Sequence, residues 1–204
     1  MSDFPAHPTP PFGRFDAVSP ALERPDLTPP AVTGALRDWK HRTAAESVLY
    51  VDTDPEKADT AVFSEVYDVP LEVGANCVVV AAKRGQEQVL VACVVLATTR
   101  LDVNRTVRKR LGARKASFAS MDTAVAETGM EYGGITPIGL PAHWPLLIDE
   151  AVAATPYVLI GSGRRRGKLI LPGAALAELP GAEVVPGLAL PVPAEPAPQD
   201  PPVR

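Results

Sequence analysis

The strongest pattern of hydrophobic and polar positions along the chain predicts a β-hairpin. Residues 76–82 and 88–97 are rich in valine and other β-forming residues, and a short polar stretch that contains Gly85 separates them. Two such runs around a glycine-containing turn are typical of adjacent antiparallel strands. If Gly85 lies at the centre of the turn, Cys77 faces Cys93 across the pair. These two are then either reduced core cysteines or a labile cross-strand disulfide.

Shorter patterns elsewhere predict a mixture of strands and helices. The expected strands are 47–52, 115–119, 157–163, 168–172 and 182–185. The expected helices are 30–42, 55–67, 102–112, 121–128, 174–179 and a short one within 146–154 that Asp149 caps. Residues 131–141 hold three glycines and two prolines, which excludes regular structure there. This order of elements predicts an α+β fold around a mixed, mostly antiparallel sheet with flanking helices.

Prolines divide the chain into three parts. Of the 23 prolines, eight lie in residues 1–30 and eight in residues 180–204, so seven remain for the middle. Proline fixes φ and lacks an amide donor, which makes both ends poor candidates for packed structure. We expect a disordered Pro-rich arm over residues 1–28, one folded domain over 29–185 and a disordered Pro/Ala-rich tail over 186–204.

Composition excludes several classes of protein. The longest apolar run, Val89 to Ala97, has nine residues and is too short to span a membrane. The two cysteines cannot form a disulfide framework, and the three histidines show no spacing typical of a metal site. The N-terminus has neither the basic nor the apolar region of a secretory signal. We therefore expect a cytoplasmic protein that holds no metal and contacts no membrane.

Positive charge is concentrated in two short segments, although the net charge is −4. Seven of the 20 Lys and Arg residues lie between positions 100 and 115, where Asp102 is the only acidic residue, and four more lie in residues 164–168. Such clusters are typical of a surface that binds a polyanion, but also of a solvated helix face and a charged turn. Charge alone leaves both interpretations open.

Two glycine turns are the places where chemistry is expected. They are GGITP (133–137) and GSGRRRGK (161–168). Glycine lets backbone amides approach a ligand closely, and clustered amides bind anions. The spacing of the second turn matches neither a phosphate-binding P-loop nor a dinucleotide fingerprint, and no nucleophile elbow surrounds Ser162. Taken singly, each turn has a structural interpretation as well as a functional one.

Taken together, the motifs resemble the YbaK/ProX family of aminoacyl-tRNA-editing domains. The pattern is a hairpin strand, a G-G-[VI]-[ST]-P loop, an L-P…[IL]-D segment and a strand that ends in a glycine turn, and it covers about residues 45–185. The residues that carry it are Gly133 to Pro137, Gly139, Leu147 to Asp149 and Ile160 to Gly163. The resemblance implies a curved, YbaK-like sheet.

The resemblance also implies hydrolysis of the ester that joins a wrong amino acid to the terminal ribose of a tRNA. An ester is already activated, so such a site has to place only a carbonyl, a water and an oxyanion donor, and no cofactor or metal is implied. Aminoacyl-tRNA is the implied partner, and an aminoacyl-tRNA synthetase is a further candidate. The two glycine turns are expected to converge on one small cavity whose amides hold the ester.

Each group of site residues is carried over from the family pattern or from the charge clusters. The implied catalytic residues are Cys77, Gly133, Gly134, Thr136, Pro137 and Ser162. The implied substrate-binding residues are Ile135, Gly161, Gly163, Asp149 and Lys168. The implied tRNA-binding residues are Arg105, Arg108, Lys109, Arg164, Arg165 and Arg166.

One position departs from the family pattern. The family's lysine at the start of the first hairpin strand corresponds to Cys77 here, and Lys83 lies at the far end of that strand, opposite Glu87. Lys168, or an arginine of residues 164–166, is an alternative source of positive charge. Three hypotheses follow. The first is a deacylase whose polar site residues are rearranged and which uses the substrate's own ribose hydroxyl. The second is a binding module of the same fold without turnover, and the third is a cysteine-dependent acyl-transfer enzyme with Cys77 as nucleophile.

Overall fold

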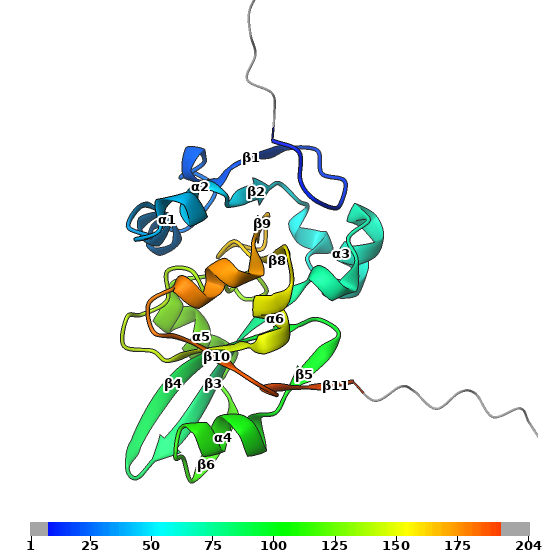
Figure 1. Cartoon of the computed structure of the whole chain (residues 1–204). Coiled ribbons are helices and arrows are strands. Elements are labelled where there is room, and N and C mark those ends of the chain that lie inside the picture. Colours follow the sequence, from blue (N-terminus) through cyan, green and yellow to red (C-terminus); the bar gives the residue numbers. More distant parts are fainter. Residues whose placement is uncertain (1–7, 193–204) are drawn as a thin grey trace, which may run out of the picture.

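Two β-sheets face each other across the centre of the fold (Figure 1). The computed structural model describes residues 8–192, apart from the side chains at 42 and 43. One sheet has the order β1 (Val18–Pro20), β2 (Leu49–Val51), β9 (Lys168–Leu171), β8 (Val158–Gly161). The other has the order β10 (Ala182–Val185), β7 (Leu146–Asp149), β4 (Glu87–Leu96), β3 (Ala75–Arg84), β6 (Lys115–Phe118). β5 (Thr99–Leu101) and β11 (Ala189–Pro191) form a separate ribbon.

The strand directions confirm the expected mixed α+β fold. β7 runs parallel to both β4 and β10, whereas the pairs within the four-stranded sheet and the β3 pairs are antiparallel. The helices are α1 (Pro30–Arg37), α2 (Arg42–Glu46), α3 (Thr60–Tyr67), α4 (Arg108–Arg110), α5 (Met121–Thr128) and α6 (Glu150–Ala154). Short helical turns are η1 (Ala21–Glu23), η2 (Pro55–Lys57), η3 (Leu71–Val73), η4 (Val103–Val107) and η5 (Gly173–Glu178). Among residues 8–192, no helix is long and apolar enough to cross a bilayer.

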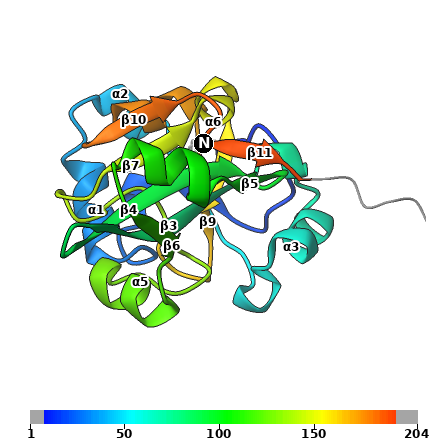
Figure 2. The same ribbon diagram turned by 90° about the horizontal axis from the view of Figure 1, so that it is seen from below.

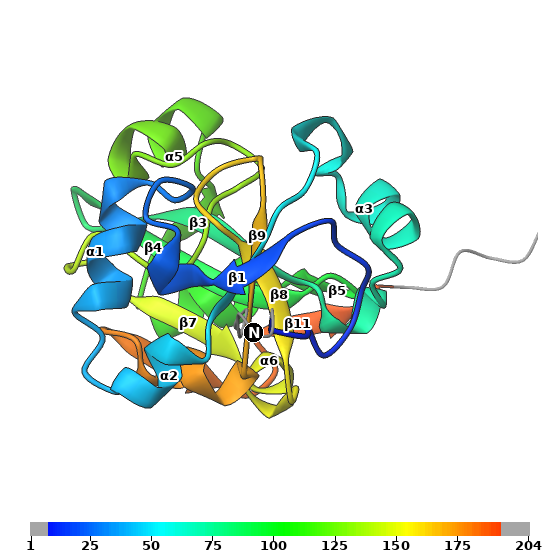
Figure 3. The same ribbon diagram turned by 90° about the horizontal axis from the view of Figure 1, so that it is seen from above.

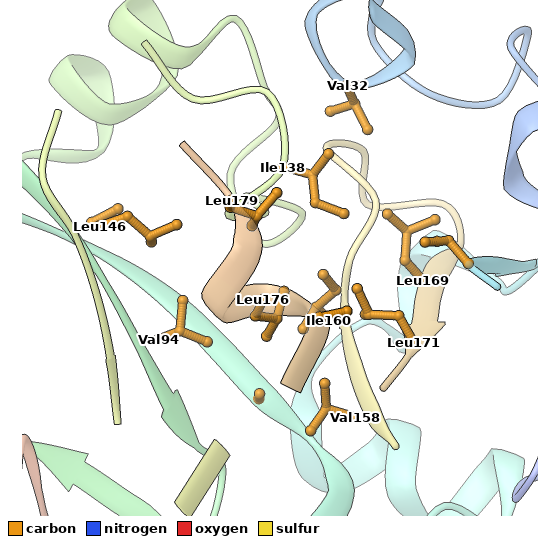
Figure 4. Close-up of a cluster of buried hydrophobic side chains, with 14 of the residues drawn as sticks. Val32, Val94, Ile138, Leu146, Val158, Ile160, Leu169, Leu171, Leu176 and Leu179 are labelled. Atoms are coloured by element: carbon orange, nitrogen blue, oxygen red, sulfur yellow. The ribbon is translucent and has the colours of Figure 1, made fainter. Parts of the chain in front are cut away.

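The main hydrophobic core fills the space between the two sheets. Figure 4 shows Val94 and Leu146 of the five-stranded sheet pointing toward Ile160 of the four-stranded one. Val32 of α1 closes the same core from the side. A second cluster, which includes Val91 and the β11 neighbour Leu188, lies on the other face of the five-stranded sheet, on the side seen in Figure 2. The hairpin strands are therefore covered on both faces.

The hairpin forms where the sequence predicts it, but its register differs by one residue. The turn consists of Gly85 and Gln86, so Cys77 lies opposite Val94, and its expected partner Cys93 lies opposite Val78. A turn of two residues has its centre between them rather than on Gly85. The cross-strand disulfide hypothesis is wrong for this register, because the two cysteines belong to different faces and clusters.

The same shift changes the neighbours of Lys83. Lys83 lies opposite Gln88 on β4 and opposite Lys115 on β6, whereas Arg84 is the residue that faces Glu87. The expected pairing of Lys83 with Glu87 is therefore wrong.

The terminal segments depart from the expected disorder. Residues 8–28 are ordered: β1 pairs with β2, and the amide of Arg14 donates to the carbonyl of Tyr67 at 2.7 Å. β1 lies at the edge of its sheet, where a proline such as Pro20 breaks no strand pairing. β11, in the expected tail, pairs with β5. Residues 1–7 and 193–204 lie outside the described residues.

Several predicted boundaries are also corrected. The helix expected over 30–42 ends at Arg37. The helix expected over 102–112 divides into the π-helical turn η4 and the short α4. The segment 146–154 begins as the buried strand β7, and α6 starts only at Glu150. A buried parallel strand is continuously apolar, so its pattern resembles that of a buried helix.

Candidate functional site

The two glycine turns meet main chain to main chain. The amide of Gly163 donates to the carbonyl of Gly134 at 2.7 Å. A Cβ on Gly161 would lie 2.6 Å from the Ile135 carbonyl oxygen and still closer to that of Gly134. A Cβ on Gly134 would overlap the Arg164 carbonyl group in the same way. The expected convergence of the two turns is confirmed, and it requires residues without a side chain.

A cavity of about 420 Å³ lies beside this junction. Gly133, Ile135 and Gly161 line it from the glycine turns, and Cys77 and Lys168 line it from β3 and β9. Residues of α3 and α5 complete its walls, and Figure 3 shows these two helices on opposite sides of the β8–β9 hairpin. With Arg165, six residues expected to form the site share one cavity, although they come from three separate segments of the chain, β3, residues 133–137 and residues 161–168.

One wall of the cavity is the part of β3 that lies beyond the end of β6. The carbonyl of Val79 accepts from the amide of Ala119, so odd-numbered residues of β3 direct their backbone groups toward the β6 side. β6 ends at Phe118, opposite Val80. The amide and carbonyl of Cys77 consequently point to the side of β3 where β6 has ended and where the Gly74–Leu159 bridge joins the start of β3 to β8.

The ammonium group of Lys168 provides positive charge inside the cavity. Lys168 is only 8% exposed, its Nζ lies 3.5 Å from the carbonyl oxygen of Gly133, and the same atom lies 5.6 Å from the ring centre of Phe63. Burial, together with the nearby charge of Arg165, lowers the pKa of Lys168, while Asp59 opposes the shift. These contacts show a buried cation that one carbonyl and one aromatic ring stabilise.

The Cys77 thiol, unlike the side chain of Lys168, supplies no charge to the cavity. Burial raises the pKa of this thiol to about 12, so it is protonated at neutral pH. A nucleophilic cysteine needs a lowered pKa or an adjacent base. The geometry therefore favours a contribution of Cys77 through its backbone rather than its sulfur.

Four expected site residues serve the surrounding structure and do not line the cavity. The Ser162 hydroxyl is buried within hydrogen-bond distance of three carbonyl oxygens of its own turn. Thr136 and Pro137 are buried in the loop that shapes the cavity. Asp149 accepts from the amide of Ala151 at 3.0 Å and from that of Ala189 at 2.9 Å. One carboxylate oxygen of Asp149 thus caps α6, and the other fixes the first residue of β11.

The three arginines of the second turn have different surroundings. Arg166 forms a two-pronged ion pair with Asp52, with both N···O distances at 2.7 Å. Arg164 donates to a main-chain carbonyl, that of Asp26. Arg165 lines the cavity, and its Nε donates to the carbonyl oxygen of Pro55 at 3.3 Å. The Asp52 carboxylate has its pKa lowered by Arg166, which fits a structural ion pair.

Residues before position 54 hold the second turn in place. The amide of Gly167 donates to the Thr53 hydroxyl at 3.0 Å, and a Cβ on Gly163 would lie 2.7 Å from the Pro29 ring. The sequence pattern identifies neither contact, because Pro29 precedes one expected helix and Thr53 follows an expected strand, both far along the chain from residues 161–168. Phe63, which lies within the helix expected over 55–67, is a further wall residue that the sequence pattern does not single out.

The basic segment 100–115 lies apart from the cavity. Arg105 and Lys109 are exposed, Arg108 donates to the carbonyl of Asn104, and Arg110 pairs with Glu183. In the described part of the chain, the cavity is lined by no residue of this segment. Nor does any group of three or more His, Cys, Asp or Glu side chains within residues 8–192 form a site for a metal ion.

Comparisons with known proteins agree with this arrangement. The family of the aminoacyl-tRNA editing domain matches residues 54–179. A protein described as a "putative trans-editing enzyme for prolyl tRNA synthetase" has the same fold, with a TM-score of 0.63 and 18% identity over 78% of this chain and 96% of the other. The "hypothetical protein APE2540" has a TM-score of 0.65 and 20% identity, and the match covers 76% of this chain and 99% of the other. A scaffold protein used for computational epitope grafting has a TM-score of 0.65 and 20% identity, and the match covers 76% of this chain and 94% of the other.

Proposed function

Because the chain belongs to the aminoacyl-tRNA editing domain family, we propose that it is a trans-editing deacylase. Its substrate would be a tRNA that carries a wrong small amino acid, and its reaction the hydrolysis of the ester. The observation that carries this proposal is the shared cavity of the two glycine turns, β3 and Lys168. Editing of this kind is needed where binding alone cannot reject an amino acid that differs by about a methylene group.

The groups around the cavity suit ester hydrolysis. Attack of water on the acyl carbon forms a tetrahedral intermediate with a negatively charged oxygen, and the ribose oxygen then leaves as a hydroxyl. The amide of Cys77 would donate to that oxygen, and the Lys168 ammonium would supply positive charge; both residues line the cavity. Asp59, the one carboxylate among the described lining residues, would hold the α-ammonium group of the substrate.

Charge on the outer surface supports a nucleic-acid partner. Arg105 and Lys109 of the basic segment 100–115 are exposed and do not line the cavity, and they would contact acceptor-stem phosphates. Phosphate contacts of this kind release counterions, so binding should weaken steeply as salt is added. The ion-paired Arg166 is better placed to stabilise its turn than to bind phosphate.

A second candidate function is binding without turnover. It is favoured by one observation, the cysteine at the position of the family lysine. In this case the cavity would hold an aminoacyl end, and tRNA would bind in a salt-sensitive way without release of amino acid.

A deacylation screen separates the two functions. Catalytic amounts of protein would be incubated with tRNAs mischarged with Ala, Ser, Cys or Thr, and released amino acid measured over several turnovers. We expect release from at least one of them, and its loss in Gly134→Val, since a side chain there overlaps the Arg164 backbone. Gly34→Ala is the matched control, because a Cβ on Gly34 meets nothing within 4 Å. Binding of these tRNAs without any release would favour the second function.

A further inference from the structure

Two aromatic side chains stand exposed at the mouth of the cavity. Phe118 is 62% exposed and Tyr132 58% exposed, and both line the same cavity as Cys77 and Lys168. They come from different elements, the end of β6 and the segment that follows α5. Exposed apolar surface beside a cavity is typical of a binding site.

We infer that Phe118 and Tyr132 form a stacking platform for the base of the terminal nucleoside of the aminoacyl-tRNA. The inference rests on the proposed function and extends it from the acyl group to the nucleotide that carries it. Unpaired bases at RNA ends are commonly recognised by stacking on aromatic side chains, and every base offers a flat π face. Neither residue is part of the glycine turns, so the platform is an addition to the site already described.

The connectivity of the substrate places its base near these rings. When the acyl group lies between Gly133 and Gly161, the ester oxygen ties it to the ribose, and the base follows directly at the mouth. The cavity volume of about 420 Å³ lies within the range that holds a ligand of drug size, roughly 300–1,000 Å³, and exceeds what a small acyl group needs. The site therefore has room for a nucleoside as well as an amino acid.

The charge around the cavity also suits a nucleotide. Arg165 and Lys168 both line it, against the single carboxylate of Asp59. Arg165 donates through Nε to a main-chain carbonyl, which leaves its guanidinium charge without a carboxylate partner among the described residues. An excess of positive charge favours the phosphate that links the terminal nucleoside to the rest of the strand. An apolar segment of a protein partner would gain nothing from these two cations.

A stable analogue tests the platform without depending on catalysis. The probe is 3′-alanylamino-3′-deoxyadenosine, in which an amide replaces the ester, and its partner probe lacks the adenine. Binding would be measured by calorimetry for the wild type, Phe118→Ala, Tyr132→Ala and the conservative variants Phe118→Tyr and Tyr132→Phe. Tyr157→Ala is the matched control, because Tyr157 is 42% exposed and does not line the cavity.

Each alanine variant should bind the adenine probe roughly five- to 150-fold more weakly, the range that corresponds to loss of one base–aromatic stack. The conservative variants and Tyr157→Ala should bind it as the wild type does, and the adenine-free probe should bind all variants alike. Equal affinity of the wild type and both alanine variants would overturn the inference. So would an equal loss with the adenine-free probe, or a loss only in binding to a prolyl-tRNA synthetase, which would identify a protein-docking surface.

The result is separable from the fate of the proposed function. If the wild type releases no amino acid from mischarged tRNA but its binding of the probe depends on Phe118 and Tyr132, the platform stands and the deacylase proposal fails. If the wild type deacylates and the alanine variants keep its KM, the deacylase proposal stands and the platform fails.

Discussion

Substitution of Gly161 by alanine tests the junction of the two glycine turns directly. The new Cβ would lie 2.6 Å from the Ile135 carbonyl oxygen and closer still to that of Gly134. Both obstacles are main chain and cannot rotate away, so the turns must separate by about 1 Å to reach ordinary van der Waals contact. Overpacking of this kind costs roughly 1–3 kcal/mol.

The expected consequences are a lower melting temperature and a large loss of deacylation. At about 2–4 °C per kcal/mol for a chain of this size, Tm should fall by roughly 2–12 °C. A displacement of about 1 Å between groups that hold the reacting atoms costs on the order of 100-fold in rate. Thermal unfolding followed by circular dichroism gives the first quantity. Release of amino acid from mischarged tRNA, measured well below Tm, gives the second.

Gly34→Ala serves as the control for the same chemical change. Gly34 lies within α1, and a Cβ there meets nothing within 4 Å. This variant should keep the wild-type rate and gain about 1 kcal/mol of stability, because alanine favours a helix interior over glycine. If Gly161→Ala keeps both the rate and the Tm of the wild type, the two turns are not held together as argued.

Three further substitutions test the surroundings of the cavity. Lys168→Met should reduce deacylation, and it should also change how stability depends on pH. Because the pKa of Lys168 is lower in the folded state than its usual 10.5, the wild type gains unfolding free energy as pH rises toward 10.5. Urea titrations at several pH values should show no such gain in the variant. Cys77→Ser should leave the deacylation rate unchanged from about pH 6 to pH 9, because a thiol with a pKa of about 12 is neutral throughout this range. A large loss of rate would instead favour Cys77 as the nucleophile. Thr53→Ala leaves the buried amide of Gly167 without its acceptor, so unfolding free energy should fall by about 1–3 kcal/mol, whereas an unchanged value would mean that this bond does not hold the turn.

Local patterns in the sequence were sufficient for most of the sheet. The hairpin, the strands β6, β8, β9 and β10 and the helix α5 lie at or close to the ranges that the sequence predicts. The register of the hairpin was harder to predict from the sequence, because a change of one residue in the turn moves every cross-strand partner. That change separated Cys77 from Cys93 and Lys83 from Glu87.

The ordered N-terminal segment illustrates what composition alone misses. Its proline content suggested disorder, yet Phe15 packs beside Phe63 and Tyr67, with ring centres 6.4 and 5.7 Å away. Whether such a segment orders depends on the partner surface, which comes from residues some fifty positions later. The meeting of the two glycine turns was likewise inaccessible from spacing and rested on the family resemblance, because no local signal links Gly134 to Gly163.

The cysteine at the position of the family lysine and the buried Lys168 are best understood together. Cys77 and Lys168 line one cavity but come from β3 and β9, strands of different sheets. Two ammonium groups in one cavity would repel each other, so a second lysine at position 77 would be unfavourable. With Lys168 present, a small neutral side chain at 77 leaves a single ammonium group between these two residues of the cavity. The positive charge is then supplied from β9, next to Gly133, rather than from β3.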